Sequence, residues 1–177
     1  MILLRHGQSE FNLHYGATGI DPGIPDAPLT PLGREQAEAA AEALAGEDIR
    51  LILCSPYTRA LQTSAPVARR LGLPVVVTAA VRERRAASCD IGSCRTDLTR
   101  AWPGLDFGAI EEVWWSHDIE PHDAFEARAA LFRLEQERHP DWAHTLVVCH
   151  WGFIQALTGQ GLPNGQWVRV AGPEGPI

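Results

Sequence analysis

The sequence predicts an α/β protein, a three-layer α/β/α sandwich around a mainly parallel central sheet. Short apolar runs alternate with longer helical segments, and turn residues separate them. Several of these runs have no polar interruption, which is typical of parallel strands buried on both faces. We expect such strands at residues 1–4, 50–54, 74–78 and 145–149. A further run at 166–170 follows the turn signal Asn164-Gly165 and is expected to form an antiparallel edge strand.

Capping signals predict helices between these strands. Thr30 and Pro31 suit the N-cap and the first position of a helix that runs to Gly46. Another helix is expected over 57–71, and Gly72 is expected to end it. Three more helices are expected, at residues 96–101, 123–139 and 153–158. The helix at 123–139 has its apolar positions at Phe125, Ala129, Phe132 and Leu134.

Two segments lack a clear period. The stretch from Tyr15 to Leu29 is rich in Gly, Pro and Asp, so we expect an irregular loop that is long enough to be functional. The segment from Arg85 to Pro121 is the place where such a fold would build a lid, and lids of this kind set substrate specificity.

Composition excludes some classes of protein. The chain of 177 residues is expected to form one domain, 1–177. Its 22 acidic and 15 basic residues give a net charge of -7, which argues against a nucleic-acid partner. No apolar run reaches the ~20 residues that span a bilayer, and no signal peptide precedes the first strand. We therefore expect a cytoplasmic protein that has no membrane partner.

The four cysteines do not form the CxxC pairs of a zinc site, so we expect reduced thiols and no metal. A disulfide between Cys89 and Cys94 is the alternative. The other histidines show no metal-binding spacing and are expected at the surface: His14, His117, His122, His139 and His144.

Charged side chains and imidazoles follow the predicted strands. Arg5 and His6 follow the first strand, Arg59 lies in the first helical turn after the second, and His150 follows the fourth. Because the carboxyl ends of parallel strands meet at one edge of a sheet, these groups are expected to converge. Two arginines and two histidines would form a cationic pocket suited to a tetrahedral dianion such as phosphate. Glu83 follows the third strand.

Several motifs in a fixed order resemble the histidine phosphatase superfamily, the phosphoglycerate-mutase-like enzymes, in the branch with an early Arg-His-Gly. The matching segments are residues 4–12, 18–19, 28–37, 55–63, 81–84 and 147–154. Arg-His-Gly alone would be a weak signal. The ordered set is a strong one because each piece would have to fall by chance beside the right predicted strand.

The resemblance implies a role for each matching residue. His6 would be the nucleophile that forms a phosphohistidine, while Arg5, Arg59 and His150 would hold the phosphoryl oxygens. Glu83 would protonate the leaving oxygen and then activate water. Asn12, Thr18 and Gly19 match positions that contact phosphate or line the pocket. No cofactor is expected, because the Arg and His side chains supply the positive charge. For this chemistry His6 should be neutral and His150 charged, so their basicities should differ.

Some assignments have alternatives. Glu83 lies among Arg82, Arg84 and Arg85, so a structural role in an ion pair with these arginines is the alternative to a catalytic role. Asp90 is then the alternative general acid. Arg84, Arg85 and Arg95 are also candidates for holding a second anionic group of the substrate.

Three tryptophans leave further alternatives open. Trp151 stands where a small residue is more usual, so it narrows the pocket or stacks on the substrate. Trp114 and Trp115 form either a wall over the pocket or part of the core.

The resemblance therefore implies a phosphomonoesterase that acts on a small phosphorylated metabolite or a phosphoprotein. A mutase is less favoured, because the chain shows no counterpart of the inserted segment whose paired arginines grip the substrate in glycolytic mutases. A non-catalytic phospho-ligand binding module is the other alternative. The substrate and the oligomeric state are not determined by the sequence.

Overall fold

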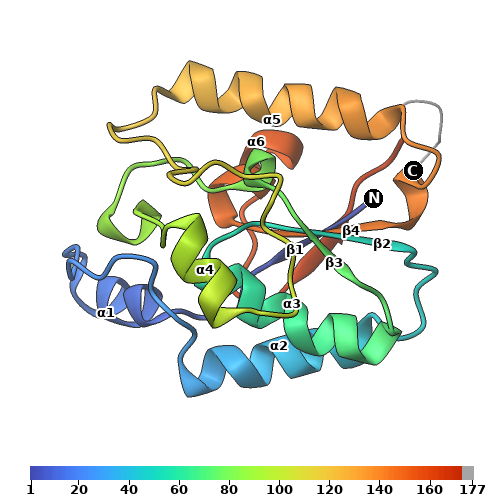
Figure 1. Ribbon diagram of the computed structural model, residues 1–177, viewed down its shortest axis with the longest axis horizontal. Helices are drawn as coiled ribbons and strands as arrows, with labels where there is room; N and C mark the ends of the chain where they lie inside the picture. Colours follow the sequence, from blue (N-terminus) through green and yellow to red (C-terminus); the bar gives the residue numbers. More distant parts are fainter. Residues whose placement is uncertain (173–177) are drawn as a thin grey trace.

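A computed structural model describes residues 1–172 of the chain (Figure 1). Its sheet has the order β3-β2-β4-β1-β5, and only β5 runs antiparallel to its neighbour, β1. The strands are β1 (Ile2–Arg5), β2 (Leu51–Cys54), β3 (Val75–Val77), β4 (Thr145–Cys149) and β5 (Trp167–Arg169). The helices are α1 (Glu10–Thr18), α2 (Pro31–Ala43), α3 (Thr58–Leu71), α4 (Arg95–Ala101), α5 (His122–Glu137) and α6 (Trp151–Thr158). The predicted α/β class, parallel core and antiparallel edge are confirmed.

The sheet separates two apolar clusters, as the three-layer prediction requires. Helices α5 and α6 cover one face, and α2 and α3 cover the other (Figure 1). Side chains of β1 alternate between the clusters: Leu3 packs beside Val147 on one face, and Leu4 packs beside Val148 on the other. Strands β1 and β4 are thus buried on both faces, which explains their uninterrupted apolar sequences. The prediction of one domain over 1–177 extends past the described residues and stays a prediction.

Three local predictions were wrong. Helix α1 was not predicted, yet it includes residues 15–18 of the expected loop and ends at Gly19, in the left-handed conformation. A capping box formed by Ser9 and Asn12 starts this helix. Helix α6 begins at Trp151, directly after β4, rather than at 153. On α5, Leu134 is exposed, because only Phe125, Ala129 and Phe132 face the core.

The segment expected to form a lid mainly completes the core. Leu98, Phe107, Ile110 and Trp114 are buried in the cluster on the α3 face of the sheet. Apolar burial therefore determines the path of most of this segment, and only its first residues reach the cavity described below.

Two other expectations concern cysteines and membranes. Cys89 and Cys94 are both free thiols, so the alternative of a disulfide is wrong. Among residues 1–172, no helix is long and apolar enough to cross a bilayer.

The turn after β1 lies against the start of α2 through two glycines. A Cβ atom at Gly7 would overlap the carbonyl oxygen of Gly33, and a Cβ at Gly33 would overlap the carbonyl oxygen of Gln8. The backbone of Gln8 also accepts a hydrogen bond of 2.9 Å from the Thr30 amide. The two glycines thus allow the backbone contact that fixes the turn carrying His6.

We expect Gly33→Ala to lower the free energy of unfolding by about 1–3 kcal/mol, because the added methyl group meets rigid backbone. Chemical denaturation of the purified variant measures this. Gly46→Ala is the matched control, since nothing lies within 4 Å of a Cβ at that position. Equal stability of both variants would contradict the close approach.

Candidate active site

The parallel pairing of β1 with β4 brings the two predicted site histidines together. Arg5 lies opposite Cys149 in the register, and the His6 amide donates to the Cys149 carbonyl at 3.0 Å. The imidazoles of His6 and His150 follow these partners, with ring centroids 5.2 Å apart. The predicted convergence at the carboxyl edge of the sheet is therefore present.

The hydrogen-bond partner of His6 determines its tautomer. Its Nδ1 lies 2.7 Å from the Gly7 carbonyl oxygen, which can only accept a hydrogen bond. Nδ1 must therefore carry the hydrogen, so Nε2 keeps its lone pair. Burial, and then the positive charges of Arg59 and Arg5, hold the pKa of His6 well below its usual value. The neutral, nucleophilic form is thus the stable one near pH 7.

His150 is fully buried beside His6. Its Nε2 lies 2.8 Å from Ser55 Oγ, while its Nδ1 is buried and has no hydrogen-bond partner among residues 1–172. Burial, Arg59 and His6 hold the pKa of His150 well below its usual value. The expectation of a charged His150 is not supported, because burial and the same cations lower the pKa of both imidazoles. If Ser55 donates to Nε2, the hydrogen of neutral His150 lies on Nδ1, which is buried.

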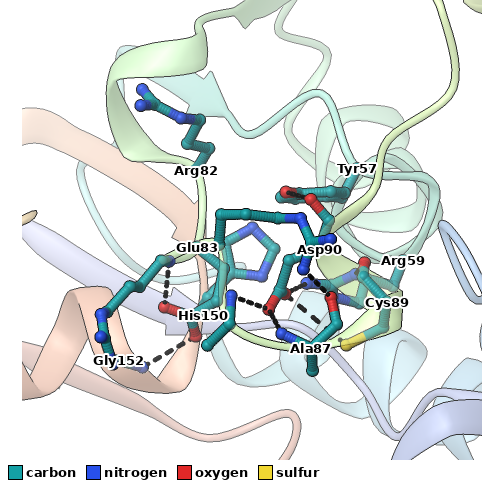
Figure 2. Close-up of polar contacts among 12 residues, drawn as sticks. Tyr57, Arg59, Arg82, Glu83, Ala87, Cys89, Asp90, His150 and Gly152 are labelled. Carbon is teal, nitrogen blue, oxygen red and sulfur yellow. Dashed lines mark hydrogen bonds and ion pairs between the residues drawn. The ribbon is translucent and has the colours of Figure 1, made fainter. Parts of the chain in front are cut away.

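Arg59 is a buried cation in the first turn of α3. Its Nη1 donates to the Cys89 carbonyl at 2.7 Å, and its Nη2 lies 3.3 Å from Asp90 Oδ1 (Figure 2). A residue distant in the sequence caps the start of this helix: Asp26 Oδ1 accepts a hydrogen bond of 2.8 Å from the Thr58 amide. These contacts hold the guanidinium at the cavity that Arg59 lines.

Asp90 is placed to hold Arg59 rather than to donate a proton. Its Oδ2 accepts hydrogen bonds from the amides of Ala86 and Ala87, at 3.1 and 2.9 Å (Figure 2). A proton on Asp90 would leave the buried Arg59 without its ion-pair partner. The geometry therefore disfavours Asp90 as the general acid.

Glu83 has the surroundings expected of an acid. Its carboxylate accepts the amide of Arg84 and the amide of Gly152, both at 2.9 Å (Figure 2). A Cβ atom at 152 would overlap Glu83 Oε1, so this approach requires glycine. Burial and the nearby charge of Asp90 raise the pKa of Glu83, although the two amides oppose the shift.

The neighbouring arginines are engaged elsewhere. Arg82 pairs with Glu120 at 3.2 Å, Arg84 donates to the Glu120 carbonyl, and Arg85 donates to the Ala87 carbonyl. Within residues 1–172, Glu83 forms no ion pair with them. The interpretation of Glu83 as a purely structural ion-pair residue is therefore not supported.

These side chains surround one cavity of about 590 Å³. Among the predicted site residues, those lining it are Arg5, His6, Asn12, Arg59, Glu83 and Trp151, and Asp90 lines it as well. His150 does not line it, because its side chain is fully buried beside His6. Arg5 is fixed by a hydrogen bond from Nη1 to the Leu162 carbonyl, and its Nε is buried with no partner in the described chain. Two arginines and the imidazole of His6 thus face one space, which suits an anion.

The residues predicted in and after α1 have different positions. Asn12 Oδ1 accepts the Ser9 amide at 3.1 Å and Asn164 Nδ2 at 3.2 Å, so Asn12 both caps α1 and borders the cavity. Thr18 and Gly19 do not line the cavity, and both are exposed. Gly19 ends α1 in the left-handed conformation. The prediction that these two residues contact phosphate or line the pocket is therefore wrong for this cavity, because they lie at the far end of α1.

The other open alternatives are also decided by position. Trp114 is buried against Tyr57, with ring centroids 4.6 Å apart, and Trp115 packs on the same cluster, so both belong to the core. Of the three arginines considered for a second anionic group, only Arg84 lines the cavity, while Arg95 pairs with Glu112 at 3.4 Å.

Sequence reasoning missed part of the cavity wall. His122, Phe125 and Glu126 reach it from the first turns of α5, and Gln155 reaches it from α6. His122 is exposed, as expected of a surface histidine, but it lies 3.3 Å from Glu126 at the cavity. His122 and Trp151 lie just before the predicted helices 123–139 and 153–158, so the sequence did not place the pairs 122/126 and 151/155 on shared helix faces.

Comparisons with known proteins agree with this geometry. Residues 1–173 match the histidine phosphatase superfamily (branch 1). The chain is 32% identical to a glucosyl-3-phosphoglycerate phosphatase of Mycolicibacterium vanbaalenii, over 97% of this chain and 84% of that protein. It is 29% identical to phosphoserine phosphatase 1 of Hydrogenobacter thermophilus, over 84% and 68%. A mycobacterial glucosyl-3-phosphoglycerate phosphatase in complex with VO3 superposes with a TM-score of 0.66 and 28% identity, over 94% and 90%.

Proposed function

Because the chain belongs to the histidine phosphatase superfamily, branch 1, and is a phosphatase, we propose that it hydrolyses small phosphomonoesters through a phosphohistidine on His6. The observation that carries this proposal is the hydrogen bond from His6 Nδ1 to the Gly7 carbonyl. This bond leaves the lone pair of Nε2 free, and His6 lines a cavity together with Arg5 and Arg59. Phosphoryl transfer depends mainly on positioning and charge neutralisation, and these residues supply both.

The proposed reaction has two displacements. In the first, Nε2 of His6 attacks phosphorus, the bond from phosphorus to the ester oxygen breaks, and the proton of Glu83 goes to that oxygen. In the second, Glu83 takes a proton from water, the water oxygen attacks phosphorus, and the bond to Nε2 breaks. Arg5 and Arg59 stabilise the phosphoryl oxygens in both steps.

The proposed substrate is a small phosphorylated metabolite that carries further polar groups. The relatives named above act on such compounds, among them glucosyl-3-phosphoglycerate. The cavity volume of about 590 Å³ is in the range of small-molecule sites. A cytoplasmic location stays a prediction, as do the proposed roles of individual site residues.

We expect the wild-type chain to release inorganic phosphate from a panel of small phosphomonoesters, in buffer containing EDTA, because Arg and His supply the cationic charge. His6→Ala should lose nearly all of this activity, because no other group in the cavity is placed to accept the phosphoryl group. Release that persists in His6→Ala would contradict the proposed nucleophile. Circular dichroism of the variant controls for loss of the fold.

We expect Glu83→Gln to lower kcat by about 10²–10⁴-fold on alkyl phosphates, because their leaving oxygen needs a proton. The loss should be much smaller on p-nitrophenyl phosphate, whose leaving group departs as a stable anion. In the wild type, kcat/KM should fall as pH rises through the raised pKa of Glu83, and Glu83→Gln should lack this limb.

Asp90→Asn provides the contrast for this acid assignment. Its defect should be the same for alkyl and aryl phosphates, because Asp90 holds Arg59. A leaving-group dependence in Asp90→Asn and its absence in Glu83→Gln would reverse the assignment.

A further inference from the structure

An exposed tryptophan borders the phosphate site. Trp151 opens helix α6, directly between His150 and Gly152, and it lines the cavity while remaining 44% exposed. An indole ring has a large apolar surface, and covering that surface lowers the free energy. An exposed indole at the edge of a cavity can therefore pack against a bound ligand. Neither the phosphoryl chemistry nor the core uses this ring.

The position of the indole depends on a second residue far along the chain. A Cβ atom at Gly161 would overlap the indole Nε1 of Trp151. The φ angle of Gly161 lies outside the left-handed region, so glycine is needed there for space and not for backbone conformation. The indole therefore packs against the bare backbone of Gly161. The next residue, Leu162, holds Arg5 through its carbonyl.

Polar side chains line the same cavity as the indole. Gln155 follows Trp151 by one turn of α6, and its side chain is exposed at the same cavity. The pair of His122 and Glu126, 3.3 Å apart, borders the cavity from α5. An aromatic face in a cavity that also presents an amide, a carboxylate and an imidazole matches a ligand that has one flat C–H face and several hydroxyl groups.

We propose that Trp151, seated on Gly161, is a specificity-determining platform for a hydroxylated ring in the leaving group, so that the enzyme prefers sugar phosphates to acyclic phosphoesters. This inference rests on the proposed phosphomonoesterase function. It adds the chemical class of the substrate, which the phosphate-binding residues do not determine. Trp151 contacts the ring of the substrate, while Gly161 acts through Trp151 as a positioning residue.

The test compares kcat/KM for glucose 6-phosphate with kcat/KM for glycerol 3-phosphate. In Trp151→Ala the ratio of the two should fall by about three- to tenfold, the range expected for loss of one aromatic contact. The change should be in KM for the sugar phosphate and not in kcat, because the platform binds ground state and transition state alike. Trp151→Phe should retain most of the preference.

Gly161→Ala should lower the same ratio without removing any atom that meets the substrate, because the new methyl group displaces the indole. In a Trp151→Ala background, Gly161→Ala should then have no further effect on the ratio. Leu134→Ala is the control, since Leu134 is another exposed apolar side chain and lies outside the cavity.

An unchanged ratio in both single variants, or additive effects in the double variant, would overturn the platform. If the preference that depends on Trp151 appears only with p-nitrophenyl phosphate, the assignment of a hydroxylated ring is wrong and Trp151 binds an aryl group instead. Either result, obtained while His6→Ala remains inactive, leaves the proposed phosphatase function standing. Loss of that function would instead appear as hydrolysis that does not depend on His6.

Discussion

The parallel pairing of β1 with β4 is the contact on which the site depends. β1 is apolar from Ile2 to Leu4 and β4 from Leu146 to Cys149, and a histidine directly follows each strand, so burying the strands side by side also brings the two imidazoles together. The pairing continues one residue past β1, through the amide of His6 and the carbonyl of Cys149. In the observed register Leu3 packs beside Val147 on one face and Leu4 beside Val148 on the other, and the same register sets the alignment of the histidines.

A second constraint holds the acid. The segment after β3 carries Glu83 between Arg82 and Arg84. The buried carboxylate of Glu120 pairs with arginines near this segment. Glu120 accepts Arg82 at 3.2 Å and Arg128 at 2.8 Å, while Arg128 also donates to the carbonyl of Arg82. Because a lone buried charge is costly, these partners fix one another and the segment between them. The amide of Gly152 then fixes the carboxylate of Glu83, beside the strand end that carries His150.

The sequence predicted the features that depend on local pattern. Uninterrupted apolar runs located the strands, Thr30 and Gly72 located helix ends, and the ordered motifs indicated which strand ends meet. Contacts through space could not be predicted. The common burial of His6 and His150 lowers both pKa values, and nothing near either residue in the sequence signals this. The ion pairs of Glu120 and the contact of Gly161 with Trp151 likewise join segments that meet only in the fold.

The central claim is that the geometry of His6 makes it the covalent carrier of the phosphoryl group. The most direct measurement is to mix the enzyme with a substrate labelled at phosphorus, stop the reaction in denaturing alkali, where phosphohistidine survives, and map the label by mass spectrometry. The account predicts one phosphoryl group on the peptide that contains His6, formed within the first turnover and discharged as free phosphate. Label on another residue, or turnover with no labelled protein at any time, would contradict it.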